Sequence, residues 1–469
     1  MAIKHLDTNR IKNIHFIGIG GISMSGLATI LLNRGYSISG SDRKASNITN
    51  NLKKSGINVF IGHSENNISH ADLVVYTAAI NNDNPELKKA QSLGVPIIDR
   101  ATLLGEIMDS YDFGIAVSGT HGKTTTTSMI STIMLCSDLN PTIHVGGYLK
   151  KIAGSTKIGG NSFFISEACE YSDSFLSLYP NLAVVLNIDF DHTDYFRNID
   201  HVKESFEKFL SHVPKDGFII ACIDDINVSN VIEKISCKNI IPYGVESKSA
   251  TWSADNISFY QNGSTSYSLI YNGQSVSDIN LNVPGIHNIS NSLAAIASCY
   301  TCGCSLESIK LGLSEFTGAM KRFEYKGSIR ESIRIFHDYA HHPAEIKATL
   351  CALKNFSHNK IICVFQPHTY SRTKAFLKQF VESFKDADII IVADIFAARE
   401  PNPGNISSDI ISEKICQLGG NSIYIKDFDE IADYINKTAS GNDIIITLGA
   451  GDIDTAGEIL LERYGQSNP

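Results

Sequence analysis

The sequence FGIAVSGTHGKTTTTSM, from Phe113 to Met129, joins an apolar run to a glycine-bounded turn and then to a threonine-rich segment with helical spacing. This order predicts a strand, a tight loop and a helix. A loop of this kind directs successive backbone N–H groups and the positive end of a helix dipole at one point. The stretch therefore predicts a binding site for a polyphosphate.

The spacing of this loop differs from that of the common P-loop. Its pattern is G-x-x-G-K-T, because Val117 stands where the first glycine of G-x-x-x-x-G-K-[ST] would fall. A glycine turn with an exposed lysine is the simpler alternative, but it leaves the threonines at the helix start unexplained. We predict that Lys123 reaches the outer phosphate oxygens and that Thr124 or Thr125 ligates Mg²⁺. The loop residues expected around the phosphates are Gly119, Thr120, His121 and Gly122.

The composition is that of a soluble protein with several domains. A chain of 469 residues predicts about three domains. The formal net charge of -9 disfavours binding to nucleic acid or to an anionic membrane. No signal-peptide region or spanning apolar run is evident, so we expect a cytoplasmic protein with reduced cysteines. We expect it to be a monomer or a weak homodimer.

Residues 1–111 predict a Rossmann-like domain. A strand runs into the glycine-rich turn GIGGIS and a helix, and the next strand leads to Asp42. This pattern resembles a dinucleotide fingerprint, with an acidic residue for the ribose about 20 positions further on. Ser23 replaces the third glycine, which disfavours NAD relative to a nucleotide diphosphate at the same helix N-terminus. The residues expected at the nucleotide are Gly18, Gly20, Gly21, Ser23 and Asp42.

The rest of the chain predicts two further α/β domains. Residues 112–322 form a P-loop ATPase-like domain with a mixed sheet, in which Asn-Gly turns between Thr251 and Val283 indicate antiparallel hairpins. Residues 323–469 form a second Rossmann-like domain. Its pattern includes one continuous helix from Ser371 to Phe384.

Polar side chains gather where two predicted strands of the central domain end. Glu167 to Asp173 follow one strand, and Asn187 to Asp194 follow the next. Each cluster alone is more typical of a solvated loop or a helix cap. Because ligands collect beyond the carboxyl ends of parallel strands, we expect both clusters to face the phosphate-binding loop and to supply Mg²⁺ ligands.

Histidines occur in two further motifs. Asn288 is expected to cap the helix that follows it, whereas a structural role and a nucleotide contact are equally supported for His287 and Asn291. The adjacent pair His341-His342 suggests a metal site together with Asp338. Adjacent histidines on a loop point apart, however, and no fourth ligand is evident, so we do not favour that site.

The order and spacing of these motifs resemble the Mur ligases of peptidoglycan synthesis along essentially the whole chain. The resemblance is closest to members that join L-alanine to UDP-N-acetylmuramate. The motifs that carry it are GIGGISMSGLA at Gly18, GTHGKTTTT at Gly119, EACEYSDSF at Glu167, NIDFDHTDYF at Asn187, PGIHNISNSLAA at Pro284, KRFE at Lys321, DYAHHP at Asp338 and QPHTYSRT at Gln366.

The resemblance implies that the three domains hold the UDP-sugar, ATP and the amino acid in turn. It implies an ATP-dependent ligase that converts the muramic acid carboxylate into an acyl phosphate, from which the amine of L-alanine displaces phosphate. A preformed tripeptide in place of L-alanine, as in wall recycling, is the alternative. A nicotinamide-dependent oxidoreductase and a regulator without turnover are the hypotheses from other classes.

The resemblance also implies roles for individual residues. Lys123 would neutralise the β- and γ-phosphates, Glu167 would share the metal ions with Thr124, and neutral His192 would hold a second Mg²⁺. The residues implied on the nucleotide side are His287, Asn288, Asn291 and Arg322. The residues implied around the amino acid and the closed active site are Asp338, His341, His342 and Arg372.

Some positions depart from the family pattern. Ser23 replaces a usual glycine at the diphosphate, and Cys169 and Tyr171 stand where small polar or acidic residues are more common. Thr369 stands where an arginine is common, which predicts weaker substrate binding.

Overall fold

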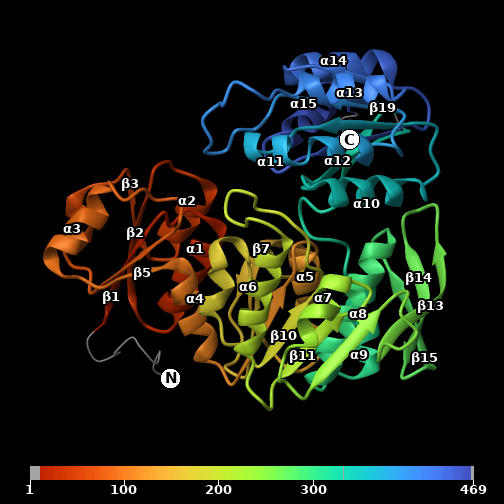
Figure 1. Ribbon diagram of the computed structural model, residues 1–469. Helices are drawn as coiled ribbons and strands as arrows, with labels where there is room; N and C mark the ends of the chain where they lie inside the picture. The colour runs from red at the N-terminus through yellow and green to blue at the C-terminus, as the bar shows by residue number, and fades with distance from the viewer. Residues whose placement is uncertain (1–10, 331, 466–469) are drawn as a thin grey trace.

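The computed structural model describes residues 11–330 and 332–465 of the chain. They form three α/β units, each built on its own sheet, which we call the N-terminal, central and C-terminal units. In Figure 1 the N-terminal unit lies at the left, and the C-terminal unit lies above the central one. The predicted α/β class and three-part organisation are confirmed, whereas the boundaries at residues 111 and 322 stay a prediction.

The N-terminal unit is a parallel sheet in the order β3-β2-β1-β4-β5. The strand order reverses at β1, so the turn between β1 and α1 opens where ligands bind such sheets. The elements are β1 (Asn13–Ile17), α1 (Ile22–Asn33), β2 (Ser37–Asp42), α2 (Asn47–Lys54), β3 (Asn58–Ile61), a 3₁₀ turn (Glu65–Ile68), β4 (Leu73–Tyr76), α3 (Pro85–Leu93), β5 (Ile97–Asp99) and α4 (Arg100–Asp109).

The central unit is a mixed sheet in the order β15-β14-β13-β12-β11-β10-β6-β9-β7-β8. Its middle strands are parallel and buried on both faces, which explains their continuous apolar sequences. Antiparallel hairpins complete the β15 edge, as predicted. The elements are β6 (Phe113–Ser118), α5 (Lys123–Leu135), β7 (Thr142–Leu149), a 3₁₀ turn (Lys150–Ile152), β8 (Gly154–Lys157), β9 (Phe163–Glu167), η3 (Tyr171–Ser177), β10 (Leu182–Val185), α6 (Ile199–Ser211), β11 (Phe218–Cys222), α7 (Ile226–Ile232), β12 (Ile240–Gly244), β13 (Trp252–Phe259), β14 (Thr265–Tyr271), β15 (Gln274–Leu281), α8 (Ile286–Thr301) and α9 (Leu306–Glu315).

The C-terminal unit is a sheet in the order β16-β17-β21-β18-β19-β20, parallel except for the β16–β17 hairpin. The elements are β16 (Glu324–Ile329), β17 (Ile333–Asp338), α10 (Pro343–Leu353), β18 (Ile361–Phe365), α11 (Tyr370–Ala375), α12 (Leu377–Ser383), β19 (Ile389–Val392), α13 (Asp409–Gln417), β20 (Ser422–Tyr424), α14 (Phe428–Thr438), β21 (Ile444–Leu448) and α15 (Asp454–Tyr464).

The prediction of one continuous helix from Ser371 to Phe384 is wrong. The helix is divided at Phe376, whose backbone leaves the helical region at φ -109° and ψ 17°. Phe376 is buried, and its ring lies 6.0 Å from Phe190 of the central unit and 4.9 Å from His342. The break therefore places an apolar side chain where the two units meet.

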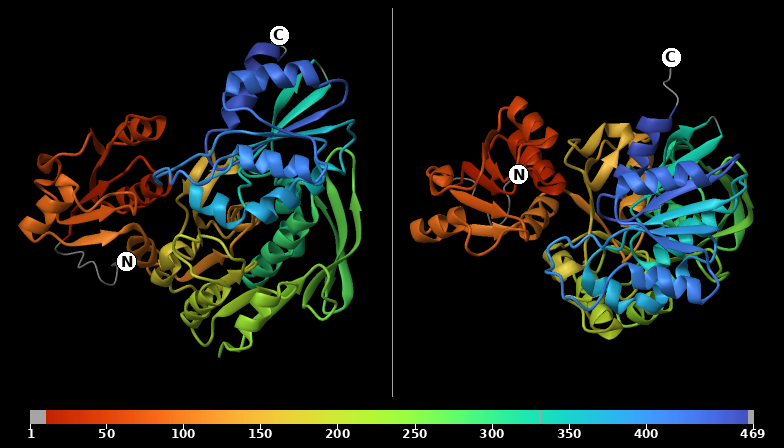
Figure 2. Two further views of the ribbon diagram at one scale, coloured as in Figure 1. Left: turned by 45° about the horizontal axis from the view of Figure 1, so that its top comes forward. Right: turned by 90° about the horizontal axis from the view of Figure 1, so that it is seen from above.

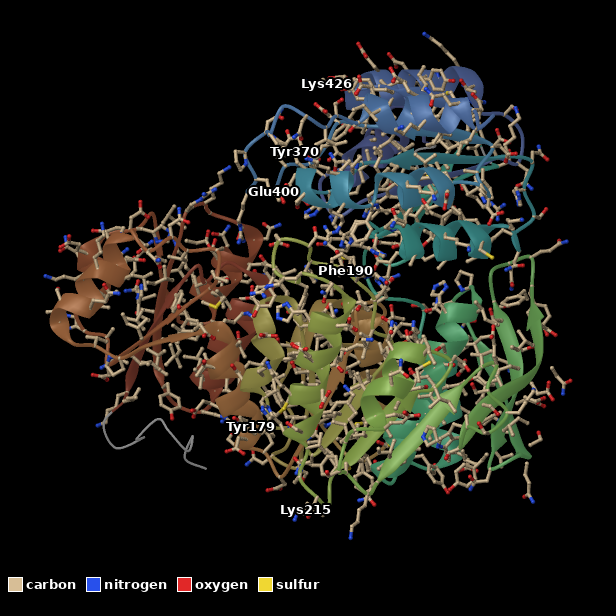
Figure 3. The ribbon with its side chains drawn as sticks, viewed as in Figure 1. Tyr179, Phe190, Lys215, Tyr370, Glu400 and Lys426 are labelled. Atoms are coloured by element: carbon tan, nitrogen blue, oxygen red, sulfur yellow. The ribbon has the colours of Figure 1, made fainter. Side chains whose placement is uncertain are left out.

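The two contacts of the central unit differ in character. The N-terminal unit shares an apolar core with it, in which Leu104 and Met108 of α4 join Phe175 and Leu178 near η3. The C-terminal unit covers the carboxyl ends of the central strands, and Figure 2 shows it stacked over them. Phe190, labelled at this junction in Figure 3, packs against the C-terminal core.

No helix within the described residues combines the length and the apolar character that a membrane crossing requires.

Candidate active site

The predicted phosphate-binding loop links β6 to α5. Gly119 and Gly122 have φ of 139° and 85°, a backbone region that side chains rarely adopt. A Cβ on Gly122 would also lie 2.6 Å from the side-chain oxygen of Asn291. Asn187 braces the loop, because its carbonyl and side-chain oxygens accept the N–H groups of Thr120 and His121 at 3.2 and 2.8 Å. The first N–H groups of α5 thus point into the space beyond the loop.

Lys123 is held over this loop by Glu170, a member of the polar cluster expected to face the loop but not one singled out from the sequence. Its Nζ lies 2.8 Å from Glu170 Oε2 and 2.5 Å from the carbonyl oxygen of Gly119. Burial opposes the charge of Lys123, but Glu170 and its acidic neighbours, among them Glu167, together outweigh burial and raise the lysine pKa. The ammonium is therefore charged and preoriented, and Glu170 is the group it would exchange for a phosphate.

The predicted metal set is only partly brought together. The Thr124 hydroxyl donates to Glu167 Oε2 at 3.1 Å, and Glu167 Oε1 accepts the Gly146 N–H at 2.7 Å. His192, at a φ of 51°, instead lies 3.6 Å from Glu170. Thr124 and Glu167 offer the hard oxygen atoms that Mg²⁺ prefers. Lys123 Nζ and His192 Nε2 both approach the same carboxylate, that of Glu170.

A cavity of about 390 Å³ opens between the central and C-terminal units. A volume of this size suits a small organic ligand. The site residues predicted from the sequence that line it are His121, Gly122, Thr125, His287, Asn288, Asn291, Arg322 and Asp338. The expectation that Asn288 caps the following helix is wrong, because α8 begins at Ile286, its N-cap is Gly285, and no side chain caps it. Asn288 lies in the first turn, where it accepts from the Asn291 amide at 3.2 Å and donates to the Pro284 carbonyl at 2.7 Å.

Charged groups from both units meet at one wall of this cavity. His121 lies 3.2 Å from Glu345 Oε1 on α10 and 3.4 Å from Asp189 Oδ2 on the central unit. Burial disfavours the charge on His121, but these carboxylates dominate and raise its pKa to about 9. Glu345 also accepts the N–H groups of His341 and His342 at 3.0 and 3.2 Å.

Glu345 and Asp189 had no role in our sequence analysis. A signal for Glu345 is present, because it stands three residues after the N-cap residue His342 and completes a capping box. Asp189 lies in the polar run after β10, where the sequence offered no way to choose among the aspartates.

Burial sets the protonation of the remaining wall residues. It raises the pKa of Asp338 to about 6, although Arg322 acts in the opposite direction. The Asp338 carboxylate accepts the Phe323 N–H at 3.1 Å and the Thr349 hydroxyl at 3.2 Å, so it ties the inter-unit linker to α10. Burial lowers the pKa of His287 and of His341 to about 4, which leaves both imidazoles neutral near pH 7.

Arg372 fastens the C-terminal unit to the central unit. Its Nε and one terminal nitrogen both lie 2.9 Å from Asp191 Oδ1, and the other terminal nitrogen lies 3.1 Å from His368. Arg372 and Asp191 are buried. Arg372 was expected near the incoming amino acid, and in this structure its charge is paired across the unit boundary. Thr369 caps α11 through the Arg372 N–H at 3.4 Å.

The glycine-rich turn of the N-terminal unit is internally bonded. The Gly18 N–H donates to the Ser41 carbonyl at 2.8 Å, and the Gly20 N–H donates to the Asp42 carboxylate at 2.9 Å. These donors, which we expected at a diphosphate, are thus occupied in this structure, as is the Asp42 oxygen expected at a ribose. The backbone N–H groups of the first turn of α1, which have no acceptor within the helix, begin at Ile22.

Ser23 connects this turn to the central unit. Its hydroxyl lies 2.9 Å from His144 Nε2 and accepts from Arg100 at 3.3 Å. Burial, helped by Arg100, lowers the pKa of His144 to about 3, so this histidine is neutral. These three residues and Glu167 line a second cavity of about 150 Å³ between the two units. The serine that departs from the glycine pattern therefore faces the same carboxylate as Thr124.

Family models match the chain in three consecutive segments. Residues 13–112 match the Mur ligase family catalytic domain, residues 117–299 the Mur ligase middle domain, and residues 321–451 the Mur ligase glutamate ligase domain.

Curated relatives align over nearly the full length. The chain is 56% identical over 457 residues to a UDP-N-acetylmuramate–L-alanine ligase of Acetivibrio thermocellus, with 97% of each chain covered. It is 48% identical over 451 residues to the ligase of the same name from Clostridium perfringens, with 96% of this chain and 98% of the relative covered.

Solved structures share the three-unit architecture. A UDP-N-acetylmuramate-alanine ligase from Thermotoga maritima superposes with a TM-score of 0.81 at 28% identity, covering 96% of this chain and 98% of the other. A murein peptide ligase from Psychrobacter arcticus shares the fold, with a TM-score of 0.71 at 24% identity, covering 98% of this chain and 100% of the other.

Proposed function

This chain belongs to the Mur ligase family, and we propose that it joins L-alanine to the carboxylate of UDP-N-acetylmuramate, with conversion of ATP to ADP and phosphate. The observation that carries this proposal is the cavity between the central and C-terminal units, where a phosphate-binding loop meets charged residues of the unit beyond it. The near-complete alignment with two ligases of that name supports the choice of substrates.

The reaction requires activation of a poor electrophile. A carboxylate oxygen of the sugar attacks the γ-phosphorus, the bond to the bridging oxygen of ADP breaks, and an acyl phosphate forms. The amine of L-alanine then attacks the acyl carbon, phosphate leaves with the electrons of the C–O bond, and the amine loses a proton. Catalysis depends on positioning and on charge stabilisation at the transferring phosphoryl group.

We assign ATP to the loop before α5 and the adjoining cavity. The N–H groups at the start of α5 would bind the β-phosphate, and Lys123 would neutralise the negative charge of the β- and γ-phosphates during transfer. The nucleoside would lie against His287, Asn288 and Asn291. Arg322, on the linker between the units, would reach the phosphates when they are present.

Mg²⁺ fits the oxygen donors beside this loop. Thr124 and Glu167 would hold the ion, and His192 would reach a second one if its contact with Glu170 opened. Such ions supply charge neutralisation at the transferring phosphoryl group. Lys123 and Glu170, already paired at 2.8 Å, keep the neighbouring charges in place before the nucleotide arrives.

We place the UDP-sugar on the N-terminal unit, with its diphosphate at the unused N–H groups of α1 and its carboxylate directed toward the cavity that Ser23 and Glu167 share. Neutral His341 and the residues around Arg372 are assigned to the amino acid side. This arrangement puts the reacting carboxylate between two units that each hold one substrate.

Competition between isotope-labelled L-alanine and a labelled tripeptide tests the choice of amine. With UDP-N-acetylmuramate and ATP present, we expect the labelled L-alanine product to dominate. Formation of only the tripeptide product would overturn the choice of amine and leave the ligase chemistry intact.

A further inference from the structure

Three potential metal ligands from separate segments converge at the boundary of the central and C-terminal units. His121 comes from the loop before α5, Asp189 follows β10, and His342 stands at the start of α10. Their ligand atoms all lie within 4.8 Å of one another. Among residues 11–330 and 332–465, these three are the His, Cys, Asp or Glu side chains whose ligand atoms lie close enough together to hold one metal ion.

His121 is oriented as metal-binding histidines usually are. Its Nδ1 lies 3.2 Å from Glu345 Oε1, and its Nε2 lies 3.4 Å from Asp189 Oδ2. In metal sites, one ring nitrogen of a ligating histidine generally donates to a carboxylate while the other faces the ion. Glu345 takes the first role. The Nε2 faces Asp189, and loss of its proton on metal binding would free a lone pair for the ion.

His342 has a nitrogen without a hydrogen-bonding partner. Its Nδ1 accepts the Ala344 N–H in a long bond of 3.3 Å and lies 3.8 Å from Asp189 Oδ2. A nitrogen that accepts carries no proton, so two acceptors face each other there. Its Nε2 is buried with no partner. Since the residue is only 4% exposed, water does not readily satisfy it. A cation bound at Nδ1 would take the place of the long Ala344 N–H bond, because this nitrogen has one lone pair, and it would stand between Nδ1 and the carboxylate.

We propose that His121, Asp189 and His342 bind one transition-metal ion of the Zn²⁺ or Co²⁺ class, which holds the C-terminal unit against the central unit. Two ligands on a tetrahedral ion of this kind lie about 3.4 Å apart, given bonds of about 2.0–2.1 Å. The separation of His121 and Asp189 matches this distance, and a small rotation brings His342 to it. Two imidazoles favour such ions over Mg²⁺, which prefers oxygen.

The site goes beyond the proposed ligase function. It lies at His121 and not at the Thr124–Glu167 pair assigned to Mg²⁺, and it joins residues of both units. The adjacent pair His341-His342, considered from the sequence, does not form it, because His341 turns its Nδ1 to the Tyr339 carbonyl at 2.9 Å.

Titration of the metal-free full chain with Co²⁺ in the absence of nucleotide tests this site. We expect one ion per chain, with the intense visible absorption of a four-coordinate site and no sulfur-to-cobalt charge-transfer band. Asp189→Asn and His342→Asn should each lower the affinity at least about tenfold. Asn at position 342 keeps a side chain that caps α10, so loss of binding would not reflect loss of the helix start.

His358→Asn is the matched control, because this histidine bonds to the Phe356 carbonyl away from the site. It should bind Co²⁺ as the unaltered chain does, and circular dichroism should be the same for all variants. Three results would overturn the proposal: no saturable binding, a thiolate charge-transfer band, or an affinity in Asp189→Asn and His342→Asn equal to that of the unaltered chain. None of these outcomes depends on ligase turnover.

Discussion

The central unit meets its two neighbours through contacts of opposite kinds. Toward the N-terminal unit the contact is apolar, with Leu104 and Met108 buried in a core that continues into the central unit. Toward the C-terminal unit it is mainly polar, because the pairs Arg372–Asp191 and His121–Glu345 cross the boundary beside the Phe190–Phe376 contact. An apolar contact has no reason to open in water, whereas charged groups can exchange each other for water or for substrate.

Because of this difference, we expect the units to move relative to each other at the boundary between the central and C-terminal units. The cavity assigned to ATP lies at the polar contact, so nucleotide entry requires that contact to loosen. The smaller cavity, beside Ser23, lies at the contact with the N-terminal unit, where Ser23 and His144 are hydrogen-bonded across the boundary. We therefore propose that the N-terminal and central units act as one body, over which the C-terminal unit closes.

The largest effect is expected from Lys123→Ala. Loss of the ammonium removes charge stabilisation at the γ-phosphate, so turnover should fall by at least about 1,000-fold. UDP-sugar affinity, measured by titration calorimetry, should be nearly unchanged because that site lies on the N-terminal unit. Lys151→Ala, which removes a partly exposed lysine of the same unit, should retain activity. Loss of sugar binding in Lys123→Ala would contradict the assignment of substrates to units.

Arg372→Ala should open the polar boundary. Removing one partner of a buried pair costs about 3–5 kcal/mol when the other charge stays buried. Here the unit can swing away and hydrate Asp191, so we expect a smaller penalty and a more extended molecule. Small-angle scattering should report a larger radius of gyration, while Lys374→Ala on the same helix, which is exposed, should not change it. An unchanged radius would show that this pair does not hold the units together.

Gly105→Ala should disturb the apolar boundary. A Cβ at this position in α4 would overlap the carbonyl oxygen of Ser177. Overpacking of this kind typically costs about 1–3 kcal/mol, so the melting temperature should fall. Gly457→Ala in α15, where the nearest atom lies 3.5 Å from the added carbon, is the helical control and should be neutral or stabilising. Equal melting temperatures for the two variants would contradict a tight, fixed contact.

The smallest effect is expected from the protonation of His121 in metal-free protein. Its pKa is raised to about 9 by Asp189 and Glu345, against the effect of burial, so the protonated ring stabilises the closed arrangement. That stabilisation is complete below the ordinary histidine pKa of about 6.5 and is lost as the pH rises through 9. Between these values the equilibrium constant for closing should fall by at most about tenfold per pH unit.

An inter-unit fluorescence pair should therefore report opening between pH 7 and about 9. The variant His121→Asn lacks the titrating ring and should show a flat profile over this range. An identical profile in both proteins would assign the pH dependence to another group.

Local patterns predicted most of the fold. Strand and helix positions followed from apolar runs bounded by glycine and polar residues, as in the strand and loop from Phe113 to Gly122. The break at Phe376 escaped prediction because its cause is the ring of Phe190, far away in the sequence. Tertiary contacts of this kind override helical periodicity, and the local sequence does not predict them.

The structure brings several of the motif residues together, whereas the sequence did not predict which residues they would pair with. The cavity gathers His287, Asn291 and Arg322 as expected. The pairing of Lys123 with Glu170 and of Arg372 with Asp191 depends on how the units meet, so the sequence predicted the side chains but not their partners. The turn at Gly18 shows the same limit, since its N–H groups are used by Ser41 and Asp42.

Phosphate release from Mg-ATP in the presence of UDP-N-acetylmuramate, with and without L-alanine, tests the proposed ligation most directly. We predict steady release only when both the sugar and L-alanine are present, at the same rate as UDP-N-acetylmuramoyl-L-alanine forms. Steady release without the sugar, or no release with any combination of substrates, would contradict it.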